Sequence, residues 1–424
     1  MSGQLLAKNY LLERLGIHFH SMSRDRVEDR VDNRAQDRVM NRLRPGKSSG
    51  KLDYIDALRG IAALSIFFYH IYGTTGSLTK GAYPIEILPE RFIGLTLVGI
   101  PLFFILSAFT LYLSLDSNAG ESRRFVKFYI RRLFRIAPLF YFLLVLVMIS
   151  GLLTGKGLPS WLNLLSNFTF TFNLIPQYST SLFQGGWTVG VEMLFYLILP
   201  LIFLKVNSLG RSLLLFIGFY WLSQEIKPLL VAMVGESTMA STNYYYYNFF
   251  HWAYIFPLGI VCYLIYKYHL PRIKSEYRNA LALCMLIISL IILFIVIDNI
   301  PLSYKLFDLY EPIAGLTSLL SMSPIAVVLM LLSLSLAPNR FIVNRFTRFF
   351  GTISYSLYLT HPFIIEPLKP AYLYIYNHTI VSTDVSLFLC VLLTLLIVTP
   401  ISLIAYHLIE TAGIMMGKTV MKRL

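Results

Sequence analysis

The chain has 424 residues, of which 56% are hydrophobic and only 14% are Asp, Glu, Lys or Arg. A soluble domain carries about 25% charged residues, and so apolar a chain of this size cannot cover its surface with polar side chains. The composition excludes a soluble enzyme and predicts an all-α, polytopic membrane protein. The net charge is +14, but in a membrane protein the placement of Lys and Arg matters more than their total, and we expect no nucleic acid as a partner.

Residues 1–51 differ from the rest of the chain because they are rich in charge and lack long apolar runs. Between residues 25 and 43, Asp or Asn, then Arg and an apolar residue recur every four positions. A four-residue period drifts around a helix of 3.6 residues per turn, so no fixed apolar stripe forms. We expect a basic cytoplasmic tail that is disordered or interfacial and could attract anionic headgroups. No cleavable signal peptide is expected.

Residues 52–411 form the predicted transmembrane domain, in which apolar runs reach the roughly 20 residues that a bilayer requires. They predict about ten transmembrane helices, near 53–73, 92–115, 138–154, 186–206, 211–232, 248–268, 278–298, 314–337, 346–366 and 384–408. With the N-terminal tail in the cytoplasm, the loops on that side hold most of the Lys and Arg, as the positive-inside rule requires. Both termini are therefore predicted to be cytoplasmic, residues 412–424 forming a short basic tail, in a multi-pass protein of the plasma (inner) membrane.

The first predicted span carries two ionisable side chains, Arg59 and His70. Such groups cost a few kcal/mol or more at membrane depth, so they usually line a cavity and have a function. Eleven helical steps leave them close to one face and about 16 Å apart along the axis. We expect Arg59 in the cytoplasmic half and His70 in the outer half. The alternative is an arginine that snorkels to the headgroups and a histidine at the outer interface.

Polar side chains in two later spans are predicted to lie at the same outer level as His70. In the fourth span these side chains are Thr188, Glu192 and Tyr196, and in the ninth they are Ser354, Tyr358 and His361. The spacing within each set places its members on one face of a helix. A carboxylate can hold the tautomer of an imidazole and stabilise its protonated form, so Glu192 or His361 could orient His70 or bind the acceptor. Two histidines and a glutamate could also suggest a metal site. No pair of histidines at i and i+4 supports that, so no metal is expected.

The segment 123–138 is basic and aromatic, and its cations at positions 124, 127, 131 and 135 lie close to one helical face. Such a helix can lie in the membrane interface as a topological anchor. The functional alternative is a cytoplasmic phosphate clamp, because forked guanidinium groups fit phosphate oxygens well. The candidate clamp residues are Arg131, Arg132 and Arg135.

Together these motifs resemble the membrane-bound acyltransferase-3 family over most of residues 52–411. In chain order the matching pieces are Leu58-Arg59-Gly60 with His70, the run 101–107, the run 131–138, the run 187–192 with Phe195-Tyr196, the run 354–361, and Ile409-Glu410. Each piece alone is weak, but their order and their positions on the predicted spans are specific. The sequence departs from the family pattern at Met193, Gly190, Ala137 and Thr360. These departures concern the fit of the acceptor more than the type of reaction.

The resemblance implies transfer of an acyl group, commonly acetyl from acetyl-CoA, to a hydroxyl of a carbohydrate or another envelope molecule. It also implies that Arg59 and His70 are essential and that Arg132 and Arg135 are associated with the acyl donor. The resemblance and the predicted membrane orientation together suggest a mechanism. In it, acyl-CoA binds at the basic segment 123–138 and its pantetheine arm extends past Arg59. His70 would then act as a general base or as a transient acyl carrier.

Two other functions are alternatives to acyl transfer. A transporter or flippase would use Arg59, His70, Glu192 and His361 as substrate or proton-relay groups, but no internal repeat is visible in the two halves. An inactive scaffold would not need to retain those side chains. Labelled acetyl-CoA would distinguish the classes, because only an acyltransferase forms a covalent product.

The acceptor is the least defined part of the sequence-based hypothesis. We expect a carbohydrate or lipid-linked sugar, with Trp187, Tyr196 and Tyr358 as candidate substrate-binding side chains and membrane lipids as the surroundings. Aromatic residues in the outer loops, at Trp161 and Tyr244 to Tyr247, could stack on sugar rings. They would equally fit an interfacial aromatic belt.

Overall fold

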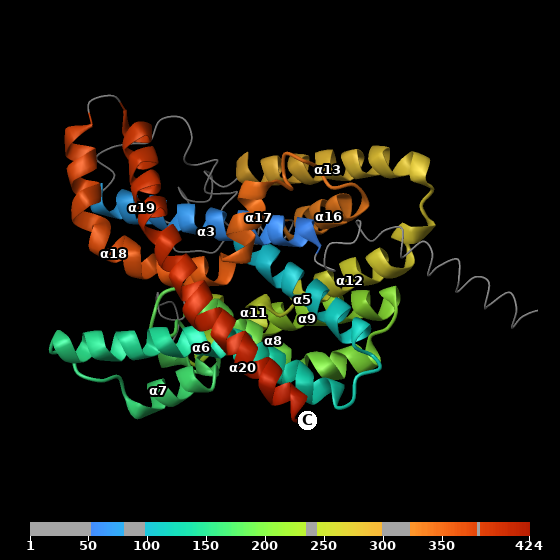
Figure 1. Ribbon diagram of the computed structural model, residues 1–424, viewed down its shortest axis with the longest axis horizontal. Coiled ribbons are helices and arrows are strands. Elements are labelled where there is room, and N and C mark those ends of the chain that lie inside the picture. Colours follow the sequence, from blue (N-terminus) through green and yellow to red (C-terminus); the bar gives the residue numbers. More distant parts are fainter. Residues whose placement is uncertain (1–51, 80–97, 235–243, 299–322, 380–381) are drawn as a thin grey trace, which may run out of the picture. The chain divides into compact units, whose positions relative to one another are not determined.

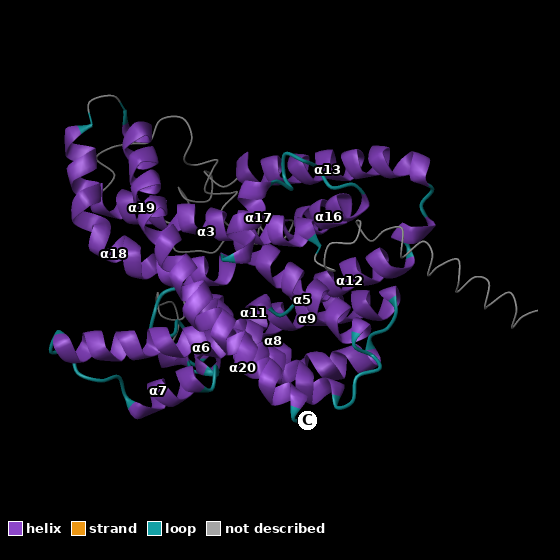
Figure 2. Cartoon of the chain, in the orientation of Figure 1, coloured by secondary structure: helices purple, strands orange, loops and turns teal. Residues whose placement is uncertain are grey.

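The computed structural model describes residues 52–79, 98–234, 244–298, 323–379 and 382–424, and every regular element in these ranges is a helix (Figures 1 and 2). Leu52–Leu270 and Lys274–Leu424 form one compact unit. The predicted N-terminal tail with its four-residue repeat lies outside the described residues.

Eight helical segments of the described chain are long and apolar enough to cross a membrane. They are α3 (Asp53–Thr79), α5 (Gly99–Ser117), α6 (Arg124–Leu153), α8 (Gly186–Lys205), α9 (Leu209–Ala232), Phe249–Arg272 with α11 (Phe249–Trp252) and α12 (Ile255–Tyr268), α13 (Ser275–Asp298), and Thr383–Lys422 with α19 (Thr383–Ala405), η4 (Tyr406–Glu410) and α20 (Thr411–Lys422). The all-α, polytopic class predicted from the sequence is confirmed.

The two remaining predicted spans take a different form. For the prediction 314–337 the structure describes only the shorter helix α16 (Ser323–Leu336), and residues 314–322 lie outside the described part. The prediction 346–366 is divided between α17 (Arg345–Thr352) and α18 (Ser354–His378). Three prolines lie inside α18, and each removes a backbone hydrogen bond and bends the helix. The curvature of α18 is visible in Figure 1.

The basic segment and the third predicted span form one continuous helix, α6, although a boundary was expected at Pro138. Proline has no N–H to bond to the carbonyl of Phe134, four residues earlier. Helix α20 covers that position, because a Cβ on Gly413 would lie 2.5 Å from Phe134 O and 2.5 Å from Pro138 Cγ. Helix α6 thus continues through the proline where α20 packs closely against it, and Arg132 and Arg135 lie within two turns before that point.

Helix α3 is held against α17 by two glycines. A Cβ on Gly60 would collide with the backbone carbonyl of Thr347, and a Cβ on Gly351 with the backbone carbonyl of Asp56. Small residues at such crossings let two helix backbones approach closely. Further along α3, Phe67 and Ile71 join a buried cluster with residues of α18 and α19. These contacts fix the face of α3 that carries Arg59.

A compact loop leads from α6 to α8 and contains α7 (Trp161–Phe168), η1 (Phe172–Leu174) and η2 (Pro176–Tyr178). The buried amide of Asn173 donates to the carbonyls of Trp187 and Tyr247 at 3.1 and 2.7 Å. Asn248 Nδ2 in turn donates to the carbonyl of Asn173 at 3.0 Å. These side chains tie the loop to the first turn of α8 and to the segment before α11, and they give buried backbone carbonyls a hydrogen-bond donor.

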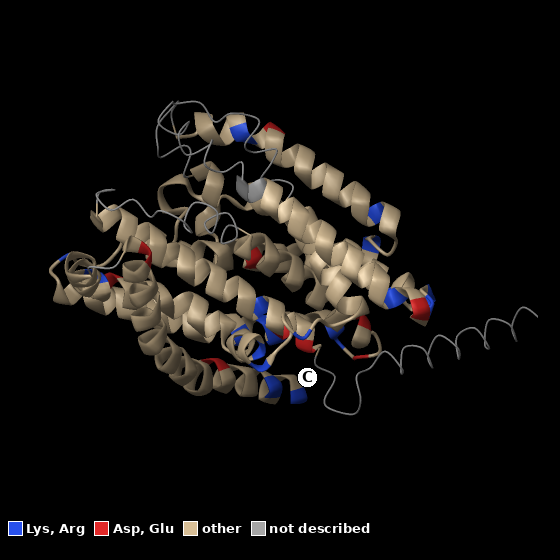
Figure 3. Cartoon of the chain, turned by 90° about the horizontal axis from the view of Figure 1, so that it is seen from above, with Lys and Arg blue, Asp and Glu red and all other residues tan. Residues whose placement is uncertain are grey.

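The outward surfaces of α6, α9 and α13 carry exposed apolar side chains, among them Leu153, Trp221 and Phe294. Figure 3 shows that the bodies of the long helices carry few charges and that Lys and Arg lie mostly near helix ends and near the C-terminus. This distribution is that of helices surrounded by lipid, with cations at the headgroup level.

Candidate functional site

A cavity of about 90 Å³ lies among α3, α5, α6, α8 and α18. Its lining includes the predicted site residues Arg59, Arg132, Arg135, Glu192, Tyr196 and Tyr358. They come from four helices that are distant in sequence, so the fold assembles most of the site that the motifs predicted. Ionisable side chains gathered around a cavity inside a membrane domain indicate a functional site.

Glu192 is fixed by two hydroxyl groups. Ser107 Oγ of α5 and Tyr196 OH of α8 both donate to Glu192 Oε1, and the two hydroxyl oxygens are 2.9 Å apart. Both donors are buried. Glu192 and Tyr196 were predicted from the sequence as site residues, whereas Ser107 was only the last residue of a matching run. Glu192 is thus a positioned acceptor of hydrogen bonds within the cavity wall.

Three arginines give the cavity an excess of positive charge. Arg59 Nη2 donates to Thr110 Oγ1 at 3.1 Å, which holds this guanidinium against α5. Arg132 Nε is buried and has no hydrogen-bond partner among the described residues. A buried donor without a partner is costly, so such a group is suited to an incoming acceptor. The cavity can therefore receive an anionic group.

The third arginine, Arg135, is held by Glu410. Arg135 Nη2 lies 3.5 Å from Glu410 Oε1, and Ser356 Oγ donates to Glu410 Oε2 at 3.0 Å. Glu410 is completely buried and sits in the single π-helical turn η4 between α19 and α20. Such turns are rare in proteins, and those that do occur often lie at functional sites. Glu410 was predicted only as part of the matching piece Ile409-Glu410, although a lone acidic residue after a long apolar run is a signal of function.

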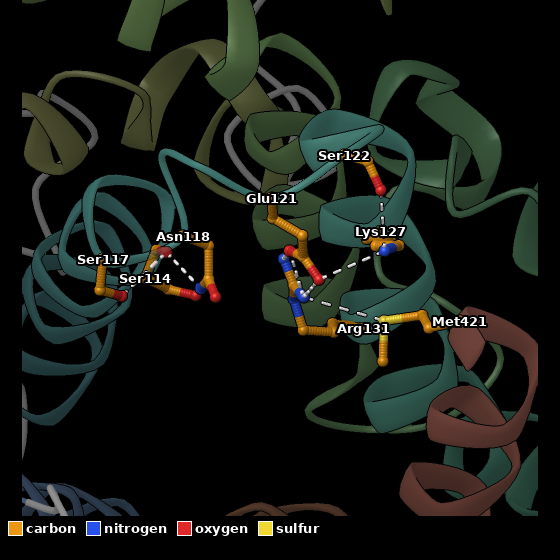
Figure 4. Close-up of polar contacts among 8 residues, drawn as sticks. All are labelled: Ser114, Ser117, Asn118, Glu121, Ser122, Lys127, Arg131 and Met421. Carbon is orange, nitrogen blue, oxygen red and sulfur yellow. Dashed lines mark hydrogen bonds and ion pairs between the residues drawn. The ribbon is translucent and has the colours of Figure 1, made fainter.

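Arg131, predicted as a third member of the phosphate clamp, lies elsewhere. Its two terminal nitrogens donate to Glu121 Oε2, each at 3.0 Å, and its Nη1 contacts Met421 Sδ (Figure 4). Lys127 also approaches Glu121, at 3.7 Å. Arg131 does not line the cavity. It directly precedes Arg132, and consecutive residues point about 100° apart around a helix. The structure therefore places Arg132 and Arg135 at the cavity and Arg131 in a contact between α6, α20 and the loop before α6.

His70 and His361 lie side by side, with ring centroids 5.1 Å apart. Nδ1 of His70 is 2.9 Å from the amide nitrogen of Gln184. Nδ1 of His361 is 3.1 Å from the carbonyl of Leu357, to which it must donate. In the neutral ring Nε2 of His361 is then the nitrogen without a proton, and it is buried without a partner among the described residues. Of the two groups proposed to orient His70, the structure brings His361 to it, whereas Glu192 is bonded to Ser107 and Tyr196.

The cavity approaches the two histidines without including them in its lining. Ile66 contributes to the lining and precedes His70 by one helical turn on α3. Tyr358 also lines the cavity, and its ring centroid is 5.8 Å from that of His361. Thr188 Oγ1 donates to Tyr358 OH at 2.8 Å. The tyrosine ring thus stands between the arginine-lined space and the histidine pair.

Trp187, predicted as a substrate-binding residue, is buried in an aromatic cluster. Its ring centroid lies 5.3 to 5.5 Å from those of Tyr246, Tyr247 and Trp252. It does not line the cavity. The observed role of Trp187 is to pack the start of α8 against the segment before α12.

The fold and the site define a polytopic helical membrane protein with a charged cavity inside its membrane domain. Residues 52–407 match the family model described as "Acyltransferase domain", and the chain belongs to this acyltransferase family, as the resemblance predicted. It is a multi-pass membrane enzyme of the O-acetyltransferase type.

Two curated proteins are similar in sequence to this chain. A protein of the Acidianus two-tailed virus named as an acetyltransferase, ORF330, is 28% identical over 322 residues, which cover 74% of this chain and 83% of the viral protein. The peptidoglycan O-acetyltransferase OatA of Listeria monocytogenes is 25% identical over 340 residues, which cover 74% of this chain and 50% of OatA. The chain therefore spans about half the length of the Listeria protein. No solved structure matches the chain.

Proposed function

We propose that the protein transfers an acetyl group from cytoplasmic acyl-CoA to a hydroxyl of an envelope carbohydrate, in the plasma membrane. The observation that supports this most is the cavity lined by Arg59, Arg132 and Arg135, which reaches Ile66, one helical turn before His70 and its neighbour His361. Acyl transfer needs a binding site for an anionic donor and a base. The arginines would provide the first and the histidines the second.

The donor would bind at the basic end of the cavity. Acyl-CoA carries phosphates, and guanidinium groups bind phosphate through forked, charge-assisted hydrogen bonds. Arg132 offers a buried donor without a partner, and Arg135 is oriented by Glu410. Arg59 lies about 16 Å from His70 by helix rise, a length on the order of a pantetheine arm. The arm would therefore extend along α3 past Arg59.

The reaction would take place at His70. The acceptor oxygen attacks the thioester carbonyl, a C–O bond forms and the C–S bond breaks. His70 takes the hydroxyl proton and passes it to the departing CoA thiolate (general-base catalysis). In the covalent route an unprotonated His70 nitrogen attacks first and carries the acyl group to the acceptor. Both routes need a ring nitrogen of His70 without a proton, and His361 is the side chain placed to assist it.

The proposed acceptor follows from the relative that is named for its substrate, the peptidoglycan O-acetyltransferase of Listeria. We propose a carbohydrate or lipid-linked sugar as acceptor, bound where Tyr196 and Tyr358 line the cavity. A hydroxyl that approaches from the outer side would meet His70 and His361 before it met the arginines. Mass spectrometry of cell envelopes with and without the protein would identify the acetylated molecule.

The decisive variant is His70→Ala, assayed in membranes with labelled acetyl-CoA. We expect acetyl transfer to fall by about 10²–10⁴-fold, the usual contribution of a general base. His378→Ala is the matched control, because this histidine lies at the far end of α18 and is exposed. Transfer at the normal rate by His70→Ala, at equal protein level, would contradict the proposal. Movement of an unmodified solute with no covalent product would indicate a transporter.

A further inference from the structure

The side chain of Gln184 is the polar group that meets His70 directly, and the sequence analysis did not select it. Its amide nitrogen lies 2.9 Å from Nδ1 of His70, across 114 positions of sequence. We propose that Gln184 is a positioning residue that occupies Nδ1 and thereby makes Nε2 the reacting nitrogen of His70. This inference rests on the proposed function and adds a residue to it.

The loop around Gln184 is anchored on both sides. Asn167 Oδ1 accepts hydrogen bonds from Ser181 Oγ at 2.7 Å and from the backbone N–H of Leu182 at 3.3 Å. The ring of Phe183 packs against those of Phe140 and Phe363, with centroids 5.0 and 5.7 Å apart. These contacts hold the chain immediately before Gln184.

Immediately after Gln184 the chain turns sharply into α8. Gly185 has a φ of 85°, in the left-handed region that favours glycine, and the helix begins at the next residue. The turn directs α8 inward, where Thr188 binds Tyr358. Gln184 is thus fixed at the outer end of the site, and its side chain reaches α3 from a segment whose backbone is held.

An amide can form a hydrogen bond with either neutral tautomer of His70. As the atoms lie, Gln184 Nε2 donates to Nδ1 of His70, which places the proton of the neutral ring on Nε2. Rotation of the amide by 180° exchanges its nitrogen and oxygen, so Oε1 then accepts a proton carried on Nδ1. Nε2 is then free to take a proton from a hydroxyl or to attack a thioester. In either orientation Nδ1 stays occupied.

The groups that face His70 explain why an amide at this position matters. His361 of α18 has its Nε2 buried without a hydrogen-bond partner among the described residues, and Tyr69 is the ring neighbour on α3, with centroids 5.4 Å apart. No Asp or Glu of the described residues forms an ion pair with His70. The ring therefore has neutral neighbours in the described structure, and its protonated form lacks the stabilisation that a carboxylate would supply.

The pH dependence of Gln184→Glu tests this role, because a merely structural residue would not change it. A carboxylate beside Nδ1 stabilises the protonated ring, so the acid limb of the kcat/KM profile should move to higher pH by about one unit or more. Gln184→Ala should lower kcat by roughly 10–100-fold, because the ring loses its orientation. Gln177→Glu is the matched control, since this exposed glutamine lies on the same loop, and the acid limb should not move.

The possible outcomes separate this inference from the proposed function. If His70→Ala is inactive but the profile of Gln184→Glu coincides with that of Gln177→Glu, Gln184 does not set the state of His70 and the inference is wrong. If His70→Ala retains full activity, the proposed function itself fails. Should Gln184→Glu not accumulate in membranes, Gln184→Asn, which keeps the amide but shortens its reach, should lower kcat without moving the acid limb. Unchanged kcat in Gln184→Asn would overturn the inference.

Discussion

Replacing Arg135 by alanine tests whether this arginine balances the buried charge of Glu410. The Glu410 carboxylate is 0% exposed and is held by Arg135 at 3.5 Å and by Ser356 at 3.0 Å. Without Arg135 the ion pair is lost, and the Ser356 hydroxyl and the more distant charge of Arg59 remain. Removing one partner of a fully buried ion pair costs about 3–5 kcal/mol. Because the Arg135 side chain is 36% exposed, solvent already screens part of the attraction, and we expect roughly 2 kcal/mol.

The assay is thermal unfolding of the purified protein in detergent, with acyl-CoA binding measured in parallel. Arg135→Ala should lower Tm, and the double variant Arg135→Ala/Glu410→Gln should regain most of the loss, because a neutral amide needs no counter-charge. Neither the single nor the double variant should bind acyl-CoA with the affinity of the unaltered protein. In Arg132→Ala, where no buried carboxylate loses a partner, Tm should stay near normal while the KM for acyl-CoA rises about tenfold or more, since a charge-assisted hydrogen bond contributes about 1.5–3 kcal/mol.

An unchanged Tm in Arg135→Ala would refute this reasoning, as would a double variant less stable than the single one. Either result would mean that Glu410 is stabilised by groups other than Arg135.

Two further predictions concern the ends of the cavity. Arg131→Ala should leave the KM for acyl-CoA unchanged, because Arg131 is bonded to Glu121 outside the cavity; a rise equal to that in Arg132→Ala would contradict its placement. Thr188→Val should raise the hydrolysis of acyl-CoA without acceptor severalfold, because it frees Tyr358, which stands between the cavity and His361. Measured release of free CoA checks this, and an unchanged rate would show that the tyrosine does not close the passage.

The sequence predicted which kinds of side chain form the site better than it predicted which of these side chains contact one another. Helical spacing correctly placed Glu192 and Tyr196 on one face, where they are hydrogen-bonded to each other. The same spacing could not show that the shared partner of both is Ser107, because that contact joins different helices. Periodicity defines the face of a helix but not the element that covers it.

Contacts between distant segments account for most of what the sequence analysis missed. Gln184 lies in an irregular loop, where no periodic pattern exists, and it reaches His70 only because the Gly185 turn and the Asn167 bonds fix that loop. Glu410 meets Arg135 through a π-helical turn that propensity does not predict. The expected boundary at Pro138 was wrong because packing of α20 compensated a local signal.

The central claim is that the acyl donor travels from the arginines to His70 along the face of α3, and a bulky residue at Ile66 tests it most directly. Ile66 lines the cavity two turns beyond Arg59 and one turn before His70. In single-turnover experiments with labelled acetyl-CoA, Ile66→Trp should still bind the donor but lose acetyl transfer by more than about 100-fold, as expected when the reacting groups cannot meet. Ile66→Val, which leaves the passage open, should transfer normally. Normal transfer by Ile66→Trp would show that the acyl group reaches its acceptor by another route.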